Sequence, residues 1–267
     1  MRTSPRLLKM KIRTITIGIN ISQARKELAD VSKYVLELRE KFETSGLEIQ
    51  SIRITTQPWP EYLGKLNEKE RILWLEEFEE ETANAGIDFI SIGSVKEPSY
   101  LKSLPDLITA TERVSASVTI DDEEIIPDTA EVFLNIGKVT GGIGNFRFGA
   151  ISNSQPDIPF FPASYHDGDR CFSIGLECSD LVNKAFETAD LDTARDQLYD
   201  ILSENFKKIE SLAKGIDHIT FKGIDTDESI VFAFEKIMNG RFGSPGTLTI
   251  ARMITRVLTE IKVRYTA

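Results

Sequence analysis

A short loop near the middle of the chain gathers residue types that can transfer protons. Residues 160–169 (Phe-Phe-Pro-Ala-Ser-Tyr-His-Asp-Gly-Asp) hold one of the two histidines, and an apolar, strand-like run at 171–177 follows at once. Loops at the ends of strands often carry binding and catalytic side chains. Because an imidazole changes charge near neutral pH, we predict His166 as a proton carrier. Glu177 is its predicted orienting or metal-binding partner, and Tyr165 is a predicted positioning hydroxyl.

Other interpretations of this region remain open. The Asp-Gly pair at 167–168 is a strong turn signal, so the loop could have a purely structural role. One histidine with scattered acids lacks the ligand spacing of a typical metal site, which leaves metal and cofactor unassigned. The acids of 225–228 are expected in a turn before a helix, where they either cap that helix or face the site.

Two glycine-rich loops are candidate ligand-binding segments. The first precedes a predicted strand, and its backbone amides could hold an anion. The second precedes a predicted helix, whose N-terminus favours anions. The first matches neither a phosphate-binding loop nor a dinucleotide fingerprint, and a structural turn is the favoured interpretation. The second can also be explained as ordinary chemistry of a helix N-terminus. The candidate residues are Gly141, Gly142, Gly144, Asn145, Gly243, Ser244, Gly246 and Thr247.

The elements that would position these residues alternate between strand and helix patterns. Strands are expected at 12–19, 47–55, 87–92, 114–119, 146–152, 171–177 and 218–221. Helices are expected at 24–42, 67–84, 101–111, 126–136, 192–213, 229–238 and 248–261. This order predicts one α/β domain over 11–267, with a largely parallel sheet covered by helices and a loose N-terminal tail over 1–10. We expect the strands at 146–152 and 171–177 to be neighbours, and ligands to bind at the carboxyl ends of strands.

Composition excludes some classes of function. The chain has 32 basic and 42 acidic residues, a net charge of -10, which argues against broad nucleic-acid binding. No apolar run approaches the roughly 20 residues of a membrane helix. Cys171 and Cys178 lie seven residues apart, so on one strand they would face opposite sides. We therefore expect two free cysteines and a reducing, cytoplasmic location.

Motifs along nearly the whole chain resemble an uncharacterised family, domain-of-unknown-function family 711. They lie at 13–19 (Arg-Thr-Ile-Thr-Ile-Gly-Ile), 86–90, 161–168 (Phe-Pro-Ala-Ser-Tyr-His-Asp-Gly), 172–177, 242–248 and 254–255. This resemblance implies a fold similar to the α/β barrels of pyruvate formate-lyase and its glycyl radical relatives. The sheet would then be closed or partly closed into a barrel, with a site inside it or at its mouth.

The resemblance also bears on chemistry and length. It implies no particular activity. Glycyl radical chemistry would need a glycine near the C-terminus, and the chain after Gly246 has none, so we expect no radical chemistry. Family members carry a further C-terminal portion, so this chain is expected to be either a compact or a truncated version.

These observations support two main hypotheses for function. The first is an enzyme that acts on a small polar or anionic metabolite by acid/base chemistry. The alternative is a non-catalytic small-molecule binding or regulatory protein that uses the same cleft. The expected partner is a small molecule, with neither nucleic acid nor membrane, and homo-oligomers are possible.

Overall fold

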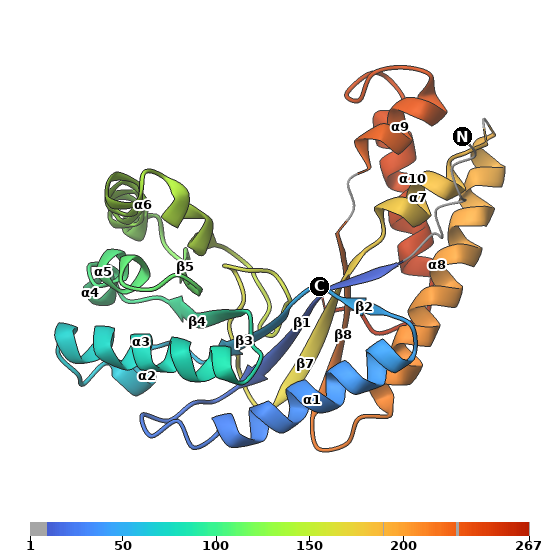
Figure 1. Ribbon diagram of the computed structural model, residues 1–267. Helices are drawn as coiled ribbons and strands as arrows, with labels where there is room; N and C mark the ends of the chain where they lie inside the picture. Colours follow the sequence, from blue (N-terminus) through green and yellow to red (C-terminus); the bar gives the residue numbers. More distant parts are fainter. Residues whose placement is uncertain (1–9, 189, 228–229, 267) are drawn as a thin grey trace, which may run out of the picture.

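A curved sheet forms the centre of the protein in a computed structural model, which describes residues 10–188, 190–227 and 230–266. Its strands run in the order β6-β5-β4-β3-β1-β7-β8, and β2 pairs with β1 beside β3. Figure 1 shows the sheet with helices along its outer side. The strands are β1 (Lys11–Ile19), β2 (Glu48–Ile49), β3 (Ile52–Thr56), β4 (Phe89–Val95), β5 (Val114–Thr119), β6 (Phe148–Ile151), β7 (Cys171–Glu177) and β8 (Thr220–Asp227).

The sheet consists of two parallel sets of strands that run in opposite directions. Each neighbouring pair from β6 to β1 is parallel, and so is the pair of β7 and β8. Strands β1 and β7 are antiparallel, so the two sets meet there. The predicted α/β architecture with a largely parallel sheet and surrounding helices is confirmed.

Closure of the sheet into a barrel is not seen. Strands β6 and β8 end the strand order, and no pairing joins them within the described ranges. The outer edge of β8 is partly covered, because Tyr265 forms a parallel bridge with Ile224.

The predicted pairing of the strands at 146–152 and 171–177 is wrong. Strand β6 pairs with β5, and β7 pairs with β1, so four strands separate them. Crossing five interstrand steps takes only about 24 Å. The connecting segment 152–170 is long enough to reach that far, since an extended chain covers about 3.3 Å per residue. Proximity in sequence therefore did not enforce pairing.

The two faces of the sheet differ in composition because successive side chains point to opposite sides. One face is aliphatic, with Ile15 and Ile17 of β1 fully buried. The opposite face carries small and polar residues that the strand register brings side by side. They are Thr14, Thr16 and Gly18 in β1, Gly175, Ser173 and Cys171 opposite them in β7, and Thr55, Ser91 and Ser115 in β3, β4 and β5. We call this surface the small-residue face.

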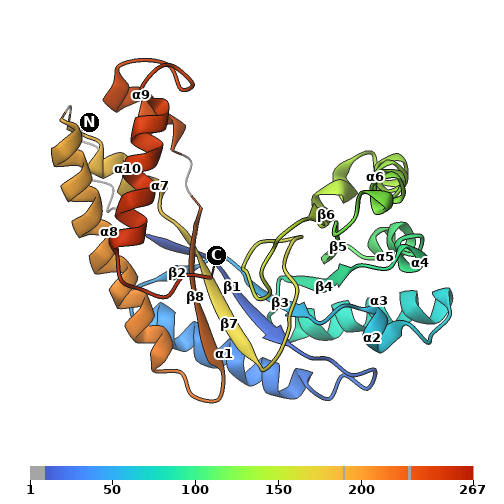
Figure 2. The same cartoon turned by 180° about the vertical axis from the view of Figure 1, so that it is seen from behind.

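Helices cover the aliphatic face, and the segment that joins β6 to β7 lies on the inner side of the curve (Figures 1 and 2). The α-helices are α1 (Leu28–Thr44), α2 (Pro60–Leu63), α3 (Glu68–Asn84), α4 (Pro98–Leu101), α5 (Leu104–Thr109), α6 (Ile126–Thr140), α7 (Ser179–Ala185), α8 (Leu191–Lys214), α9 (Val231–Met238) and α10 (Thr247–Glu260). Two 3-10 turns are η1 (Glu123–Ile125) and η2 (Ile143–Arg147).

Local sequence signals explain how several of these elements begin and end. Asn67 and Glu70 form a reciprocal capping box at the start of α3, as the sequence predicts. Helix α6 ends at Gly141, which adopts a left-handed conformation. A hydrophobic core connects residues from Met10 to Ile261, so Met10 is buried, while residues 1–9 of the predicted tail lie outside the described residues.

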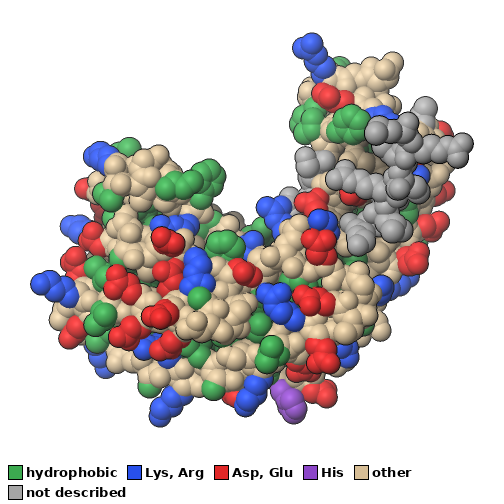
Figure 3. Space-filling model, viewed as in Figure 1, with side chains coloured by type: hydrophobic (Ala, Val, Ile, Leu, Met, Phe, Trp, Pro, Cys, Tyr) green, Lys and Arg blue, Asp and Glu red, His purple; other side chains and the backbone are tan. Residues whose placement is uncertain are grey.

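Strand β8 is longer than the sequence predicts. Asp225 lies within the strand and pairs with Gly175 of β7, so it is not in a turn. Glu228, the last acid of that group, falls outside the described residues. Among the helices in the described part of the chain, none is both long and apolar enough to cross a lipid bilayer. Figure 3 shows acidic and basic side chains interspersed over one side of the molecule.

Candidate functional site

The loop 152–170 is fastened to the small-residue face by hydrogen bonds from serines beneath it. Ser173 Oγ donates to the Asp157 carbonyl at 2.6 Å, and Ser91 Oγ donates to the Ser164 carbonyl at 2.6 Å. Small hydroxyl side chains allow the loop backbone to approach the strands closely. The backbone of the loop therefore packs directly on the small-residue face. Its side chains point either into the sheet or away from it.

The imidazole of His166 points into the sheet and is 1% exposed. Its Nε2 lies 3.0 Å from the Gly168 carbonyl, which can only accept, so Nε2 carries a proton. Its Nδ1 lies 2.6 Å from Oδ1 of the buried Asp157 carboxyl. A contact this short between two acceptors requires a proton between them. The ring is therefore held at both nitrogens.

The side chains of Cys171 and Lys222 complete this group of contacts. We call Asp157, His166, Cys171 and Lys222 together the His166 cluster. Cys171 Sγ is 3.8 Å from His166 Nδ1, and Lys222 Nζ is 3.1 Å from Asp157 Oδ2. Burial alone would raise the pKa of Asp157, but hydrogen bonds and charge from its neighbours, above all His166, lower it. Burial and the nearby Asp157 charge raise the pKa of the Cys171 thiol, which is therefore protonated near neutral pH.

Gly18 of β1 provides the space that the cluster occupies. A Cβ atom added there would lie 2.5 Å from His166 Nδ1 and 2.8 Å from both Asp157 Oδ1 and Cys171 Sγ. Three polar atoms from the loop and β7 thus converge over one glycine. Any side chain at this position would displace at least one of them.

Tyr165 points away from the cluster into a cavity of about 390 Å³. This cavity, the Tyr165 crevice, lies at the carboxyl ends of β3, β4 and β5, where parallel sheets commonly bind ligands. Its polar lining consists of Glu61, Ser94, Lys96, Glu97, Tyr100, Thr119 and Tyr165.

The polar groups of the Tyr165 crevice are partly engaged with neighbouring groups. Tyr165 Oη donates to the Ser154 carbonyl at 3.0 Å, and Lys96 Nζ pairs with Asp121 at 2.9 Å. Glu61 is exposed, but partial desolvation raises the pKa of its carboxyl, and the negative charge of Asp167 adds to this effect. Glu61 therefore binds a proton more readily than an ordinary glutamate.

A smaller cavity of about 80 Å³, the Arg53 cavity, lies on the other side of the loop. The Arg53 guanidinium carbon is 5.1 Å from the centroid of the Phe161 ring. Burial and the neighbouring charge of Arg13 lower the pKa of Arg53. Asp225 also lines this cavity, and burial raises its pKa. Two arginines side by side favour a small anionic group here.

Glu177 does not reach His166. It lies at the far end of β7 from Cys171, about 20 Å along the strand, because β7 does not fold back. Its carboxylate accepts from the Ser179 amide at 3.0 Å and lies 4.0 Å from Arg13. Asp157, from the same loop as the histidine, occupies the position that we predicted for Glu177.

The glycine loops lie apart from these cavities. Gly141 and Gly142 adopt positive φ after α6, and the Gly144 amide donates to the Thr140 hydroxyl at 2.9 Å. Near α10, the Gly243 amide donates to the Thr247 hydroxyl at 3.0 Å. Ligand binding at these loops, with the contributions of Asn145, Ser244 and Gly246, stays a prediction.

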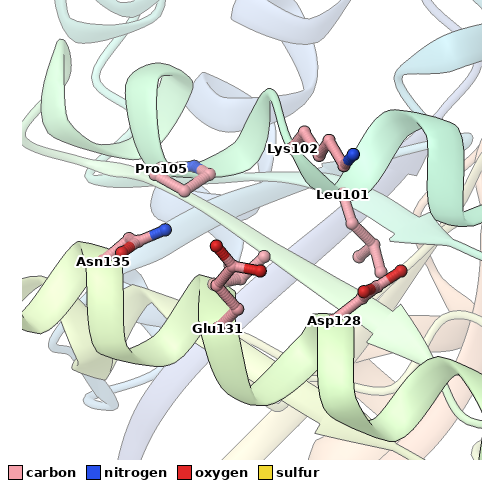
Figure 4. A pocket seen from close by; sticks show the side chains of 7 residues that line it. Leu101, Lys102, Pro105, Asp128, Glu131 and Asn135 are labelled. Carbon is pink, nitrogen blue, oxygen red and sulfur yellow. The ribbon is translucent and has the colours of Figure 1, made fainter.

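A third cavity, of about 310 Å³, lies in the helical layer between α6 and the segment of α4 and α5 (Figure 4). Its labelled side chains include Lys102, Asp128 and Glu131. None of the residues in the loop 152–170 lines it. It is therefore separate from the candidate site.

Sequence reasoning singled out His166 and Tyr165 as candidate site residues but missed the groups that surround them. Asp157 is nine residues upstream of His166 and carried no motif of its own. One signal was present, since the pattern Thr14-x-Thr16-x-Gly18 alternates small residues with isoleucines. Such alternation indicates a strand face that admits a closely approaching segment.

The chain is similar in sequence to proteins without an assigned role. A model of the family described as "Uncharacterised ACR (DUF711)" matches residues 6–265. A UPF0210 protein from Methanopyrus kandleri is 24% identical over 230 residues, covering 72% of this chain and 51% of that protein. A UPF0210 protein from Methanospirillum hungatei is 23% identical over 239 residues, which cover 75% of this chain and 51% of that protein. A UPF0210 protein from Lactococcus lactis is 27% identical over 140 residues, which cover 46% of this chain and 30% of that protein. The chain spans about half the length of the curated relatives it matches, or less.

Proposed function

We propose, from the premise that this chain belongs to the uncharacterised DUF711 family, that it is an enzyme acting on a small polar metabolite bound in the Tyr165 crevice. The observation that carries the proposal is the position of Glu61. This exposed carboxyl lines a cavity of about 390 Å³ together with Tyr165 and Lys96, and partial desolvation there raises its pKa. Cavities of this size are typical of small-molecule sites.

The residues of the crevice divide into roles by their chemistry. Glu61 is the proposed acid/base group, because a raised pKa brings a carboxyl closer to the working pH. Tyr165 positions the substrate through its hydroxyl. Lys96 is already paired with Asp121, so the acids Glu61 and Glu97 dominate the charge of the lining and favour a substrate with hydroxyl or amino groups.

His166 acts as a positioning residue in this proposal. Its ring is hydrogen-bonded beneath the loop, and its backbone amide donates to the Thr56 carbonyl at 2.9 Å. These contacts hold the loop backbone at the point where Tyr165 turns toward the crevice. The predicted role of Glu177 as a partner of His166 has no place in this arrangement, since Asp157 fills that position.

A non-catalytic binding protein is the second candidate, and the Arg53 cavity supports it. Arg53 and Arg13 lie beside a space that suits one phosphate- or carboxylate-sized group. A protein that senses a small anion would need no acid/base group. The two candidates therefore use different cavities, and variants can separate them.

We also propose that the sheet can be closed into the expected barrel. Strands β6 and β8 are the two ends of the strand order, and additional strands that paired along them would close the sheet. Closure would bring the Tyr165 crevice and the loop 152–170 inside the barrel. Similarity to the pyruvate formate-lyase barrels stays a prediction.

The proposal is tested by a thermal-shift screen against polar metabolites, followed by turnover assays on the compounds that bind. Glu61→Gln should lower turnover by a factor of roughly 10² to 10⁴ while binding persists. Tyr165→Phe should weaken binding of the same compound. Glu68→Gln, an exposed acid in the first turn of α3, is the matched control and should change neither.

Two outcomes would count against the enzyme. Turnover that survives Glu61→Gln unchanged would remove its acid/base group. Saturable binding without any turnover, abolished by Arg53→Gln and unaffected by Tyr165→Phe, would favour the anion sensor.

A further inference from the structure

We propose that Asp157, His166 and Cys171 form a binding site for a divalent transition-metal ion of the zinc class. Their ligand atoms, one oxygen, one nitrogen and one sulfur, all lie within 4.8 Å of one another, and all three residues are buried. This site is distinct from the Tyr165 crevice and does not depend on the function proposed for it.

The three ligand atoms already converge on a common point. The position of a hypothetical Cβ on Gly18 lies 2.5 to 2.8 Å from all three. Bonds from zinc are about 2.0–2.3 Å long, so an ion slightly farther from the Gly18 backbone would meet all three at bonding distance. The absence of a side chain at Gly18 leaves room for it.

Neighbouring groups orient two of the three ligands, His166 and Asp157. His166 Nε2 donates to the Gly168 carbonyl at 3.0 Å, which leaves Nδ1 as the coordinating atom. Metal-bound histidines usually donate their other ring N–H to a carbonyl or carboxylate in this way. Lys222 pairs with Oδ2 of Asp157 at 3.1 Å, so Oδ1 is the oxygen directed at the ion.

The donor set selects the class of metal. Imidazole nitrogen and thiolate sulfur suit zinc and its neighbours in the first transition row, whereas Mg²⁺ and Ca²⁺ prefer sites made of oxygen atoms. Three protein ligands leave a fourth tetrahedral position.

Binding is balanced in charge and in protons. The ion would replace the proton between His166 Nδ1 and Asp157 Oδ1, and the thiol proton of Cys171, so two positive charges enter and two leave. The charge that Lys222 faces is unchanged. The Nδ1–Oδ1 separation, now 2.6 Å, must widen by roughly 0.7 Å to suit two bonds of a tetrahedral ion.

The test is titration of the chelator-treated protein, residues 1–267, with Zn²⁺ and with Co²⁺. We expect one ion per chain, a near-ultraviolet sulfur-to-cobalt charge-transfer band, and a Tm raised by roughly 5–10 °C at a hundredfold excess over Kd. Cys171→Ser should abolish the band. Cys178→Ser is the matched control, because Cys178 is also buried and forms no disulfide, and it should keep the band.

His166→Asn provides a second variant that can keep the fold. Its amide nitrogen can still donate to Asp157, but it removes the coordinating imidazole, so we expect folded protein that binds no cobalt. Glu61→Gln should leave cobalt binding intact, which separates this test from that of the proposed function.

Three results would overturn the proposal. Wild-type protein that takes up far less than one equivalent of either ion has no such site. A charge-transfer band that survives Cys171→Ser, or that disappears in Cys178→Ser, would place the sulfur ligand elsewhere. The cluster would then be a buried ion pair only.

Discussion

Gly18 lies directly opposite Cys171 in the antiparallel register of β1 and β7. This pairing puts the residue without a side chain beneath the His166 ring and next to the sulfur that completes the cluster. The position of the cluster is thus set by strand register, since a shift of one residue would put Ile17 or Ile19 in place of the glycine.

Substitution of this glycine should destabilise the protein. The Cβ of Gly18→Ala would come within 2.8 Å of three cluster atoms, so the loop would have to lift. We expect a loss of about 1–3 kcal/mol in the free energy of unfolding, measured by urea denaturation. Gly240→Ala is the control, because its added Cβ would meet only a carbonyl oxygen at 3.8 Å. Equal stability of the two variants would contradict the tight packing over Gly18.

The buried carboxylate should give stability a defined pH dependence. The folded-state pKa of Asp157 is lowered, so its stabilising contribution is fully present above the ordinary carboxyl pKa of about 3.9. That contribution should be lost as the pH falls further, through the lowered folded-state value. We expect Asp157→Asn to be less stable by about 1–3 kcal/mol at pH 7, because it removes the carboxylate that the buried His166 ring and the partly exposed Lys222 contact.

Urea unfolding between pH 7 and pH 2 provides the measurement, because this range extends well below the ordinary carboxyl pKa. The difference in stability between wild type and Asp157→Asn should shrink toward the acid end of this range. A difference that stays constant with pH would mean that the carboxylate charge is not the source of the stabilisation.

Asp225 should give the stability of the protein the opposite dependence on pH. Burial raises its folded-state pKa, so the folded protein holds this proton more firmly, and stability falls as the pH rises through that value. Asp225→Asn should therefore raise Tm at pH 7, and the gain should vanish at acidic pH. Asp192→Asn, at an exposed position in the first turn of α8, is the control. A lower Tm for Asp225→Asn at pH 7 would show that the carboxylate makes a favourable contact there.

The assignment of the sheet faces can be checked with two phenylalanines. Phe172 of β7 is fully buried and its ring centroid lies 5.3 Å from that of Phe221, whereas Phe146 is 79% exposed. Phe172→Ala should lower the free energy of unfolding by about 3–5 kcal/mol, and Phe146→Ala should lower it by less than about 0.5 kcal/mol. Both values are measured by chemical denaturation. Similar costs for both would indicate that β7 presents its other side to the helices.

The sequence predicted the elements well where a local pattern dominates. The alternation of Ile15, Ile17 and Ile19 identified β1 and its buried face, and Asn67 with Glu70 identified the start of α3. These signals depend on a few adjacent residues, so they can be recognised without knowledge of the rest of the fold.

Long-range pairing was not readable in the same way. Asp225 was expected in a turn because aspartate is unfavourable in strands, yet pairing with Gly175 extends β8 through it. The partner of His166 was sought in the next strand, at Glu177, although it comes from Asp157 earlier in the same loop. Both errors concern contacts that only the folded loop and sheet create.

The reversal of direction between β1 and β7 gives the sheet two rims at which parallel strands end, instead of one. The five parallel strands from β6 to β1 end at the rim that holds Tyr165 and Glu61, while β7 and β8 end at the opposite rim beside Arg53. The segment 152–170 contributes Tyr165 to one rim and Phe161 to the other. The two proposed cavities therefore share one segment of chain, so a displacement of this segment at one rim would also move the residues that it contributes to the other.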